Sequence, residues 1–411
     1  MVVLKKKKIK KAQKKVIKPK KTVSKKVVKV KPKSSKKKVL IKRVLKKTKP
    51  KKLVLGKRKV PSLVKKFTGN PIMGPSPSSS WESEAVFNPA AVVSNGRIHL
   101  FYRALGGDGL SRIGYASSKD GIHFDERMSY PVYVAENFND AMKHHPYTSP
   151  ARLVYDTAVY SSGGGWGGCE DPRATKIDGR IYLTFNMFNG WESMRIAFTS
   201  ITEEDLNDKK WNWSKFLYLS RPGDRQKNWV LFPEKFNGKF ALFHNLDLGD
   251  PGRVHIAFVD ELDMYKTPTQ REAPDVHTLP DHIVSWHNRT RSASAPPIKT
   301  KDGWLLFYHA MDKDDPGRYK VGAMLLDLQD PTKVIYRASY PIIEPDLWYE
   351  NDWKPGIVYA SGAVVKDGTL FIYYGGGDKH IAVAYVSLEE FLSKLKNKEN
   401  IVFSRKSIIK V

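Results

Sequence analysis

Cysteine, early acidic residues and long apolar runs are what this 411-residue sequence has least of. Its one cysteine, Cys169, has no partner for an internal disulfide and fits a reducing compartment, so we expect a cytoplasmic protein. No apolar run approaches the length that spans a bilayer, which argues against a membrane-spanning helix. The first acidic residue is Glu82, whereas residues 1–66 hold 31 lysines and arginines. The net charge of +29 is therefore concentrated at one end of the chain.

Residues 1–66 form a lysine-rich segment that has no acidic and no aromatic residue. Charge repulsion and the lack of large side chains to bury predict a disordered tail. The apolar core of a signal peptide is missing. A flexible arm of this charge would bind a polyanion, such as RNA, DNA or an anionic surface, although it lacks aromatics for base stacking. Residues 67–411 hold 40 basic and 42 acidic residues and are expected to form the catalytic domain, with the oligomeric state left open between monomer and homo-oligomer.

One pattern occurs five times after residue 81: an apolar stretch, a turn at Asn-Gly or Asp-Gly, and a strand rich in aromatics. The copies are "NPAAVVSNGRIHLFYRA", "DPRATKIDGRIYLTFNMF", "FPEKFNGKFALFHN", "APPIKTKDGWLLFYHA" and "ASGAVVKDGTLFIYYGGG". These turns are strong hairpin signals, and another apolar strand follows each copy. Five such units in series predict an all-β fold, a five-bladed β-propeller, with a jelly roll or a sandwich as the competing architecture. A capping box at Ser387 and Glu390 predicts a terminal helix.

In a propeller the inner strands converge on a central channel, so polar residues at equivalent strand ends are candidates for a site. They are Asn88, Arg103, Asp171, Arg173, Lys235, His244, His309 and Asp378. A wet channel also tolerates polar residues without any chemistry, and that interpretation stays open. No zinc-type histidine spacing, phosphate-binding loop or serine-nucleophile motif occurs, so we expect no metal and no cofactor.

Segments in every repeat carry a resemblance to one family. "GCEDPRATKIDGRIYLTF", "FNPAAVV", "SRIGYASSKDGIHF", "VLFPEKFNGKFALFHN", "PPIKTKDGWLLFYHAM", "AMLLDLQDP" and "LFIYYGGGDKHIAVA" resemble glycoside hydrolase family 130. That family comprises mannoside phosphorylases and related β-mannosidases built on five-bladed propellers. The resemblance covers roughly residues 67–390 and leaves the basic tail outside.

The resemblance implies inverting phosphorolysis of β-mannosides, with inorganic phosphate as nucleophile and α-mannose 1-phosphate as product. Asp171 would be the general acid, its proton relayed to the departing oxygen through a mannosyl hydroxyl. Lys227, Asn228, Lys235 and His244 match the phosphate-binding positions, Asn88, Arg103 and Asp378 match those that hold the mannosyl unit, and His309 is expected to face the same pocket. A proton donor must stay protonated near neutral pH. An ion pair with Arg173 would lower the pKa of Asp171, so we expect Arg173 to have a structural role or to contact a substrate hydroxyl.

Two departures from the family pattern keep a hydrolase open as an alternative. Asn245 stands where the family usually has arginine, and "TRSASA" replaces a glycine-rich segment; Arg289 and Arg291 could compensate. A hydrolase would need a second carboxylate as base, for which Glu234, Glu344 and Glu350 are candidates. A lectin-like propeller is a further alternative, which the presence of Asp171 disfavours.

Overall fold

The computed structural model describes residues 62–134, 165, 167–189, 194–223, 226–244, 254–263, 276–278, 284, 286–312, 314–397 and 401–402. Up to Pro61, the predicted disordered tail lies outside the described residues. The chain divides into two units, residues 1–59 and 60–411, and only the second contains described residues.

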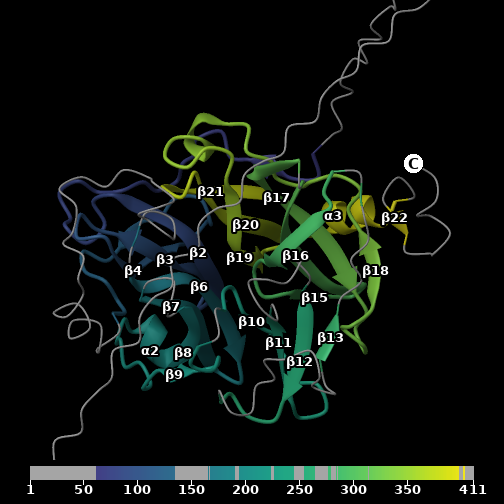
Figure 1. Ribbon diagram of the computed structural model, residues 1–411, viewed down its shortest axis with the longest axis horizontal. Helices are drawn as coiled ribbons and strands as arrows, with labels where there is room; N and C mark the ends of the chain where they lie inside the picture. Colours follow the sequence, from purple (N-terminus) through teal and green to yellow (C-terminus); the bar gives the residue numbers. More distant parts are fainter. Residues whose placement is uncertain are drawn as a thin grey trace, which may run out of the picture. The chain divides into compact units, whose positions relative to one another are not determined.

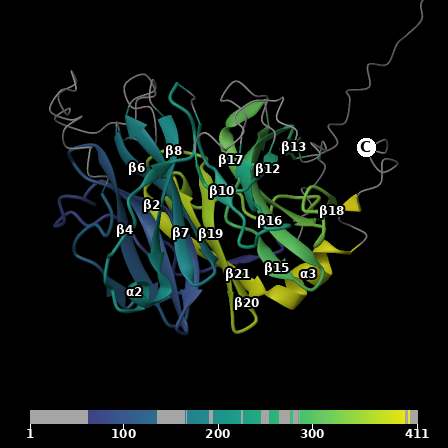
Figure 2. The same cartoon turned by 90° about the horizontal axis from the view of Figure 1, so that it is seen from below.

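Five successive strand units make up the described fold (Figures 1 and 2). The first has β2 (Ala85–Ser94), β3 (Arg97–Leu105), β4 (Leu110–Ser118) and β5 (Glu126–Arg127); the second has β6 (Gly167–Ile177), β7 (Arg180–Asn189), β8 (Met194–Thr202) and β9 (Leu217–Tyr218); the third has β10 (Val230–Leu231), β11 (Phe240–His244), β12 (His255–Val259) and β13 (Val276–Thr278). The fourth has β14 (Arg289–Ala293), β15 (Ile298–Thr300), β16 (Gly303–Asp312), β17 (Asp315–Leu326), β18 (Val334–Arg337) and β22 (Ile401–Val402); the fifth has β19 (Val358–Lys366), β20 (Thr369–Gly376), β21 (His380–Ser387) and β1 (Lys65–Lys66). The all-β prediction is confirmed.

All five predicted hairpins are present. At four of them both central residues have positive φ, as at Asn95 (44°) and Gly96 (71°), which is the type I′ geometry that matches strand twist. The fourth hairpin differs, because Gly303 has φ 146° and a Cβ there would lie 2.4 Å from the carbonyl oxygen of Leu326.

The strand units follow one another in cyclic order. β2 contacts β6, β6 contacts β10, β11 contacts β14, β16 and β17 contact β19, and β19 contacts β2. Apolar clusters fill these contacts; Phe101 shares one with Leu183, and Leu100 shares another with Val364. Among the described strands, hydrogen bonds do not link all five units: the strands form four sheets, and parallel pairing of β4 with β6 joins the first two units.

Helices are few among the described residues: α2 (Glu203–Asn207), the 3-10 helix η1 (Trp348–Glu350) and α3 (Leu388–Leu395). The predicted terminal helix is α3, and the Ser387 hydroxyl accepts a hydrogen bond from the backbone N–H of Glu390 at 3.4 Å. Within the described ranges, none of the helices combines the length and the apolar character needed to cross a membrane.

The sheet of the fifth unit is completed by a strand from the N-terminal part of the chain. Lys65 and Lys66 form β1, which pairs antiparallel with β21, so this ordered strand begins two residues before the expected domain boundary at Phe67. Lys66 also forms ion pairs with Asp346 and with the fully buried Glu350, 2.7 Å away. Glu350 accepts further hydrogen bonds from the Tyr374 hydroxyl and from the backbone N–H groups of Asp346 and Leu347. An edge strand and a buried carboxylate therefore both need this lysine.

We expect Glu350→Ala to lower the free energy of unfolding by about 3 kcal/mol, because it leaves Lys66, the Tyr374 hydroxyl and two N–H groups without their acceptor. The matched control is Glu344→Ala, which breaks a half-exposed pair with Lys320 and should cost less than about 1 kcal/mol. Urea unfolding of both variants measures the difference. Equal losses would show that Glu350 does not hold β1 in place.

Candidate active site

Irregular pairing at one end of four strand units positions the candidate residues. The register shifts between Phe87 and Ala90 in β2, between Glu170 and Arg173 in β6, between Thr290 and Ser292 in β14, and between Ala360 and Gly362 in β19. Asn88 and Asp171, which lie in the first two shifts, have φ 49° and 50°. Bulges re-aim side chains, and positive φ is costly for residues other than glycine, so the surrounding structure must hold these two in place.

The bulges of the first two units bring Asp171 into contact with polar partners from three strands. Asn88 donates from Nδ2 to Asp171 Oδ1 at 2.7 Å, and Arg103 lies 3.3 Å from the same oxygen. Asn186 on β7 donates to Oδ2 at 3.3 Å. All four side chains are buried, with 7% or less of each residue exposed. We call the group formed by Asn88, Arg103, Glu170, Asp171, Asn186, Lys227 and Asn228 the Asp171 cluster.

Glu170 is the second carboxylate of the cluster, and it is fully buried. Arg103 lies 2.9 Å from its Oε1 and Lys227 lies 3.3 Å from its Oε2. A buried charge needs such partners, since removing an ion from water costs several kcal/mol. Glu170 therefore fixes two cations beside Asp171.

The cations also set the ionisation of Asp171. Burial by itself raises the pKa of a carboxyl group. Here the charges of Arg103, Lys227 and Arg173 outweigh burial, and the pKa of Asp171 lies below its usual value. The protein without substrate thus holds Asp171 ionised, unlike the protonated acid that the sequence led us to expect.

Arg173 acts on Asp171 through the backbone. Its guanidinium donates to the carbonyl oxygens of Asp171 and Ser294, each at 2.7 Å, and to the Tyr359 hydroxyl at 2.9 Å. It forms no ion pair with the Asp171 carboxylate. These bonds fix the bulge that carries Asp171 to the fourth and fifth units.

His309 and Arg173 both contact Tyr359. The His309 ring stacks on Tyr359 at 4.0 Å between centroids, and the Ser292 hydroxyl lies 3.2 Å from Nδ1. Burial, together with the charge of Arg173, lowers the pKa of His309 to about 3. The ring is therefore neutral near pH 7.

The structure brings together most, but not all, of the predicted phosphate-binding residues. The backbone N–H of Asn228 donates to Asn186 at 2.9 Å, which places Asn228 beside Lys227 in the cluster. His244, at the end of β11, packs on Trp229, the next residue after Asn228. Asn245 lies outside the described residues.

Lys235 lies elsewhere. It is 3.9 Å from Asp178, in the turn that follows β6, and its ammonium lies over the Phe240 ring. Asp178 is seven residues beyond Asp171, or roughly 20 Å along an extended strand. Lys235 belongs to the hairpin end of the third unit, so the structure does not bring it to the cluster.

The fifth unit contributes Asp378, which is buried, has φ 54° and pairs with Lys354 at 3.1 Å. Its charge also acts on Arg103: although burial opposes the effect, Glu170, Asp171 and Asp378 raise the pKa of that guanidinium. Asp378 therefore lies within electrostatic reach of the cluster.

Sequence reasoning missed Asn186, Lys354 and Tyr359. Asn186 stands opposite Glu170 in the register of β6 and β7, and the only signal in the sequence is an amide inside the aromatic run "TFNMF". Lys354 and Tyr359 become relevant only through partners that are distant in sequence.

The three candidate bases for a hydrolase lie outside the cluster. Glu234 pairs with Lys299 at a half-exposed position, Glu344 pairs with Lys320, and Glu350 is committed to Lys66. No group of three or more His, Cys, Asp or Glu side chains in the described ranges is arranged to hold a metal ion.

Comparison with known proteins agrees with the resemblance. A family model described as beta-1,4-mannooligosaccharide phosphorylase matches residues 155–397. A 1,2-beta-oligomannan phosphorylase from Thermoanaerobacter sp. (strain X514) is 36% identical over 336 residues, covering 80% of this chain and 98% of the relative. A beta-1,2-mannobiose phosphorylase from the same strain is 34% identical over 339 residues, covering 79% and 97%.

A solved structure of a glycosyl hydrolase from Bacteroides ovatus has a TM-score of 0.62 and 25% identity, covering 80% of this chain and 96% of that one. The family match spans more than half of the chain, and two relatives above 30% identity are covered almost completely. The chain belongs to glycoside hydrolase family 130.

Proposed function

We propose that this protein catalyses the phosphorolysis of β-mannosides, and that its preferred substrates have β-1,2 linkages. The observation that carries the proposal is the Asp171 cluster, in which one candidate proton donor lies among cations rather than facing a second free carboxylate. The two relatives at 36% and 34% identity support the reaction and the linkage, since both are named as β-1,2-mannoside phosphorylases.

In the proposed reaction a phosphate oxygen attacks C1 of the terminal mannosyl unit as the glycosidic bond breaks. Asp171 supplies a proton, relayed through a mannosyl hydroxyl, to the departing sugar oxygen. The products are α-mannose 1-phosphate and the shortened sugar, and Asp171 is left ionised. Asn88, Arg103 and Asp378 are assigned to the mannosyl unit, whereas Lys227, Asn228 and His244 are assigned to phosphate, with Arg173 and His309 supporting the bulge behind them.

Bound phosphate would raise the pKa of Asp171 and so allow this residue to carry a proton. The pKa of Asp171 is low because Arg103 and Lys227 are nearby. A phosphate dianion beside Lys227 would offset that positive charge and raise the pKa of Asp171. Binding of the nucleophile and protonation of the acid are then coupled, and inorganic phosphate is the only co-substrate required.

A hydrolase is the weaker proposal. Each of Glu234, Glu344 and Glu350 is engaged by a lysine outside the cluster. Arg291 favours a phosphate-binding enzyme over a hydrolase. It lies at the register shift of β14, a position equivalent to those of Asn88 and Asp171 in the first two units. Its charge also acts on His309.

We further propose a five-bladed β-propeller for residues 67–411, supported by the cyclic order of contacts and by the apolar clusters between neighbouring units. A cytoplasmic location and polyanion binding by residues 1–66 stay predictions from the sequence, as does the homo-oligomer.

The test of the function is incubation of the full chain with β-1,2-mannobiose, with and without inorganic phosphate. We expect mannose 1-phosphate only when phosphate is present, because Glu170 is paired with Arg103 and Lys227 and Asp171 is assigned as the proton donor, which leaves no further carboxylate in the cluster to activate water. Product analysis by anion-exchange chromatography measures it. Free mannose formed at a rate indifferent to phosphate would instead establish a hydrolase.

Asp171→Asn should lower kcat by about a hundredfold to ten-thousandfold, the usual contribution of a general acid, in a protein that still folds. Asp178→Asn is the matched control, since Asp178 has the same backbone conformation (φ 48°) but lies in an exposed turn. Turnover by Asp171→Asn at the level of the control would remove Asp171 from the mechanism.

A further inference from the structure

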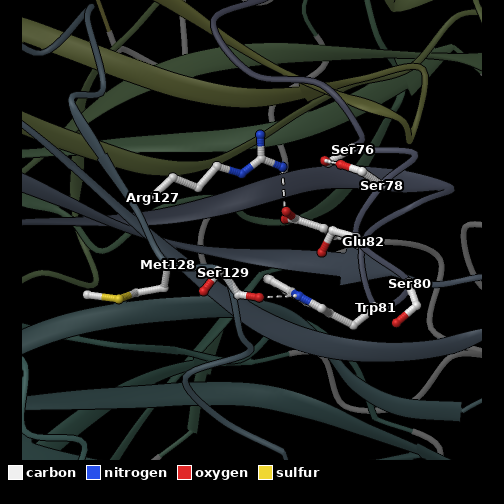
Figure 3. Close-up of a pocket in the computed structure, with 9 residues that line it drawn as sticks. Ser76, Ser78, Ser80, Trp81, Glu82, Arg127, Met128 and Ser129 are labelled. Carbon is white, nitrogen blue, oxygen red and sulfur yellow. Dashed lines mark hydrogen bonds and ion pairs between the residues drawn. The ribbon is translucent and has the colours of Figure 1, made fainter.

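A polar pocket of about 490 Å³ lies in the first strand unit, and its lining includes no member of the Asp171 cluster (Figure 3). Its walls are the segment that precedes β2 and the segment that begins with β5. The lining residues are Ser76, Ser78, Ser79, Ser80, Trp81, Glu82, Arg127, Met128 and Ser129. The volume is within the range of small-ligand sites.

A hydrogen bond and an ion pair connect the two walls of the pocket in the absence of ligand. The indole N–H of Trp81 donates to the carbonyl oxygen of Ser129 at 3.1 Å, and Arg127 pairs with Glu82 at 2.8 Å (Figure 3). The Tyr102 hydroxyl donates to the same carboxylate oxygen, Glu82 Oε2, at 3.0 Å. A pocket with fixed walls loses little entropy when it binds a ligand.

The pocket retains unused hydrogen-bonding capacity. Within the described part of the chain, Glu82 Oε1 accepts no hydrogen bond, although the Glu82 side chain is only 4% exposed. Arg127 donates from Nε to the Tyr102 hydroxyl and from Nη2 to the Gly74 carbonyl oxygen and Glu82 Oε2. Its Nη1 has no acceptor in the same described ranges. The hydroxyl groups of Ser80 and Ser129 likewise make no hydrogen bond to described residues.

The charges select the class of ligand. A free anion would meet the Glu82 carboxylate, and a free cation would meet the Arg127 guanidinium, so neither is favoured. A neutral ligand with many hydroxyl groups fits both, because each hydroxyl can donate to a carboxylate and accept from a guanidinium. The half-buried ring of Trp81 adds an apolar surface of the kind on which the C–H face of a sugar packs.

The pocket also lies within reach of the catalytic centre. Asn88 lies only six positions after Glu82, at most roughly 20 Å along an extended chain. Asn88 in turn is bonded to Asp171 at 2.7 Å. An oligosaccharide of several units can bridge such a distance, whereas both units of a disaccharide are needed on the two sides of the bond to be cleaved.

We propose that this pocket is a distal subsite that binds a mannosyl unit far from the cleaved bond in a long β-mannoside. The proposal rests on the proposed function for the choice of sugar. It assigns Trp81, Glu82 and Arg127 to the recognition of chain length, a role separate from the chemistry at Asp171.

The test is calorimetric titration of the full chain with β-1,2-mannohexaose and β-1,2-mannobiose, together with KM and kcat for both at saturating phosphate. Trp81→Leu should weaken hexaose binding and raise its KM by about tenfold, with kcat and the mannobiose values unchanged. Ser80→Gln places a larger side chain in the pocket from an exposed position, and it should weaken hexaose binding and raise the KM in the same way. This second variant keeps the test decisive if Trp81→Leu does not fold. Trp211→Leu is the control, since this indole also forms a single hydrogen bond, to Tyr130, but lines no part of the pocket.

Hexaose affinity that is unchanged in both pocket variants overturns the proposal, and so does an equal loss for mannobiose and hexaose. Failure of the proposed function is a different result: the unaltered protein would then form no mannose 1-phosphate from either sugar. The titrations decide the binding proposal even in that case, because they do not require turnover.

Discussion

Burial of two adjacent carboxylates, Glu170 and Asp171, is the constraint on which the rest of the site depends. Neither charge can stay in the interior without partners, and the partners come from separate strand units: Arg103 from β3 in the first and Lys227 from the segment before β10 in the third. Glu170 takes the closer contacts of both cations. Asp171 is left with the longer contact to Arg103, 3.3 Å against 2.9 Å for Glu170.

Backbone geometry complements these charges. Asp171 lies in a bulge at positive φ, a conformation that an isolated strand would not keep. Arg173 holds it by bonding the carbonyl oxygens of Asp171 and Ser294, and so ties the second unit to the fourth. The apolar clusters between neighbouring units keep those anchors at a fixed separation. Asp171, the proposed proton donor, is thus positioned by contacts from several strand units rather than by its own hairpin alone.

The sequence predicted what depends on local chemistry. Asn-Gly and Asp-Gly turns located all five hairpins, and repeat equivalence placed Asn88, Arg103 and Asp171 together. It could not predict pairings between distant segments, so it assigned the whole of β1 to the tail and missed Asn186. It put Lys235 in the site on the strength of the family resemblance, although Lys235 lies only two residues before the Asn237-Gly238 turn and therefore at the hairpin end of the third unit. It also expected a protonated Asp171, since the summed effect of three cations appears only in the folded chain.

The central claim is that phosphate binding lets Asp171 hold a proton that the free protein does not. Carbon-13 NMR of aspartate carboxyl groups across pH, with the Asp171 signal assigned by its absence in the asparagine variant, measures this ionisation directly. The account predicts a pKa below the usual aspartate value in the free protein and a higher pKa when phosphate is bound. An Asp171 signal that titrates identically with and without phosphate would contradict it.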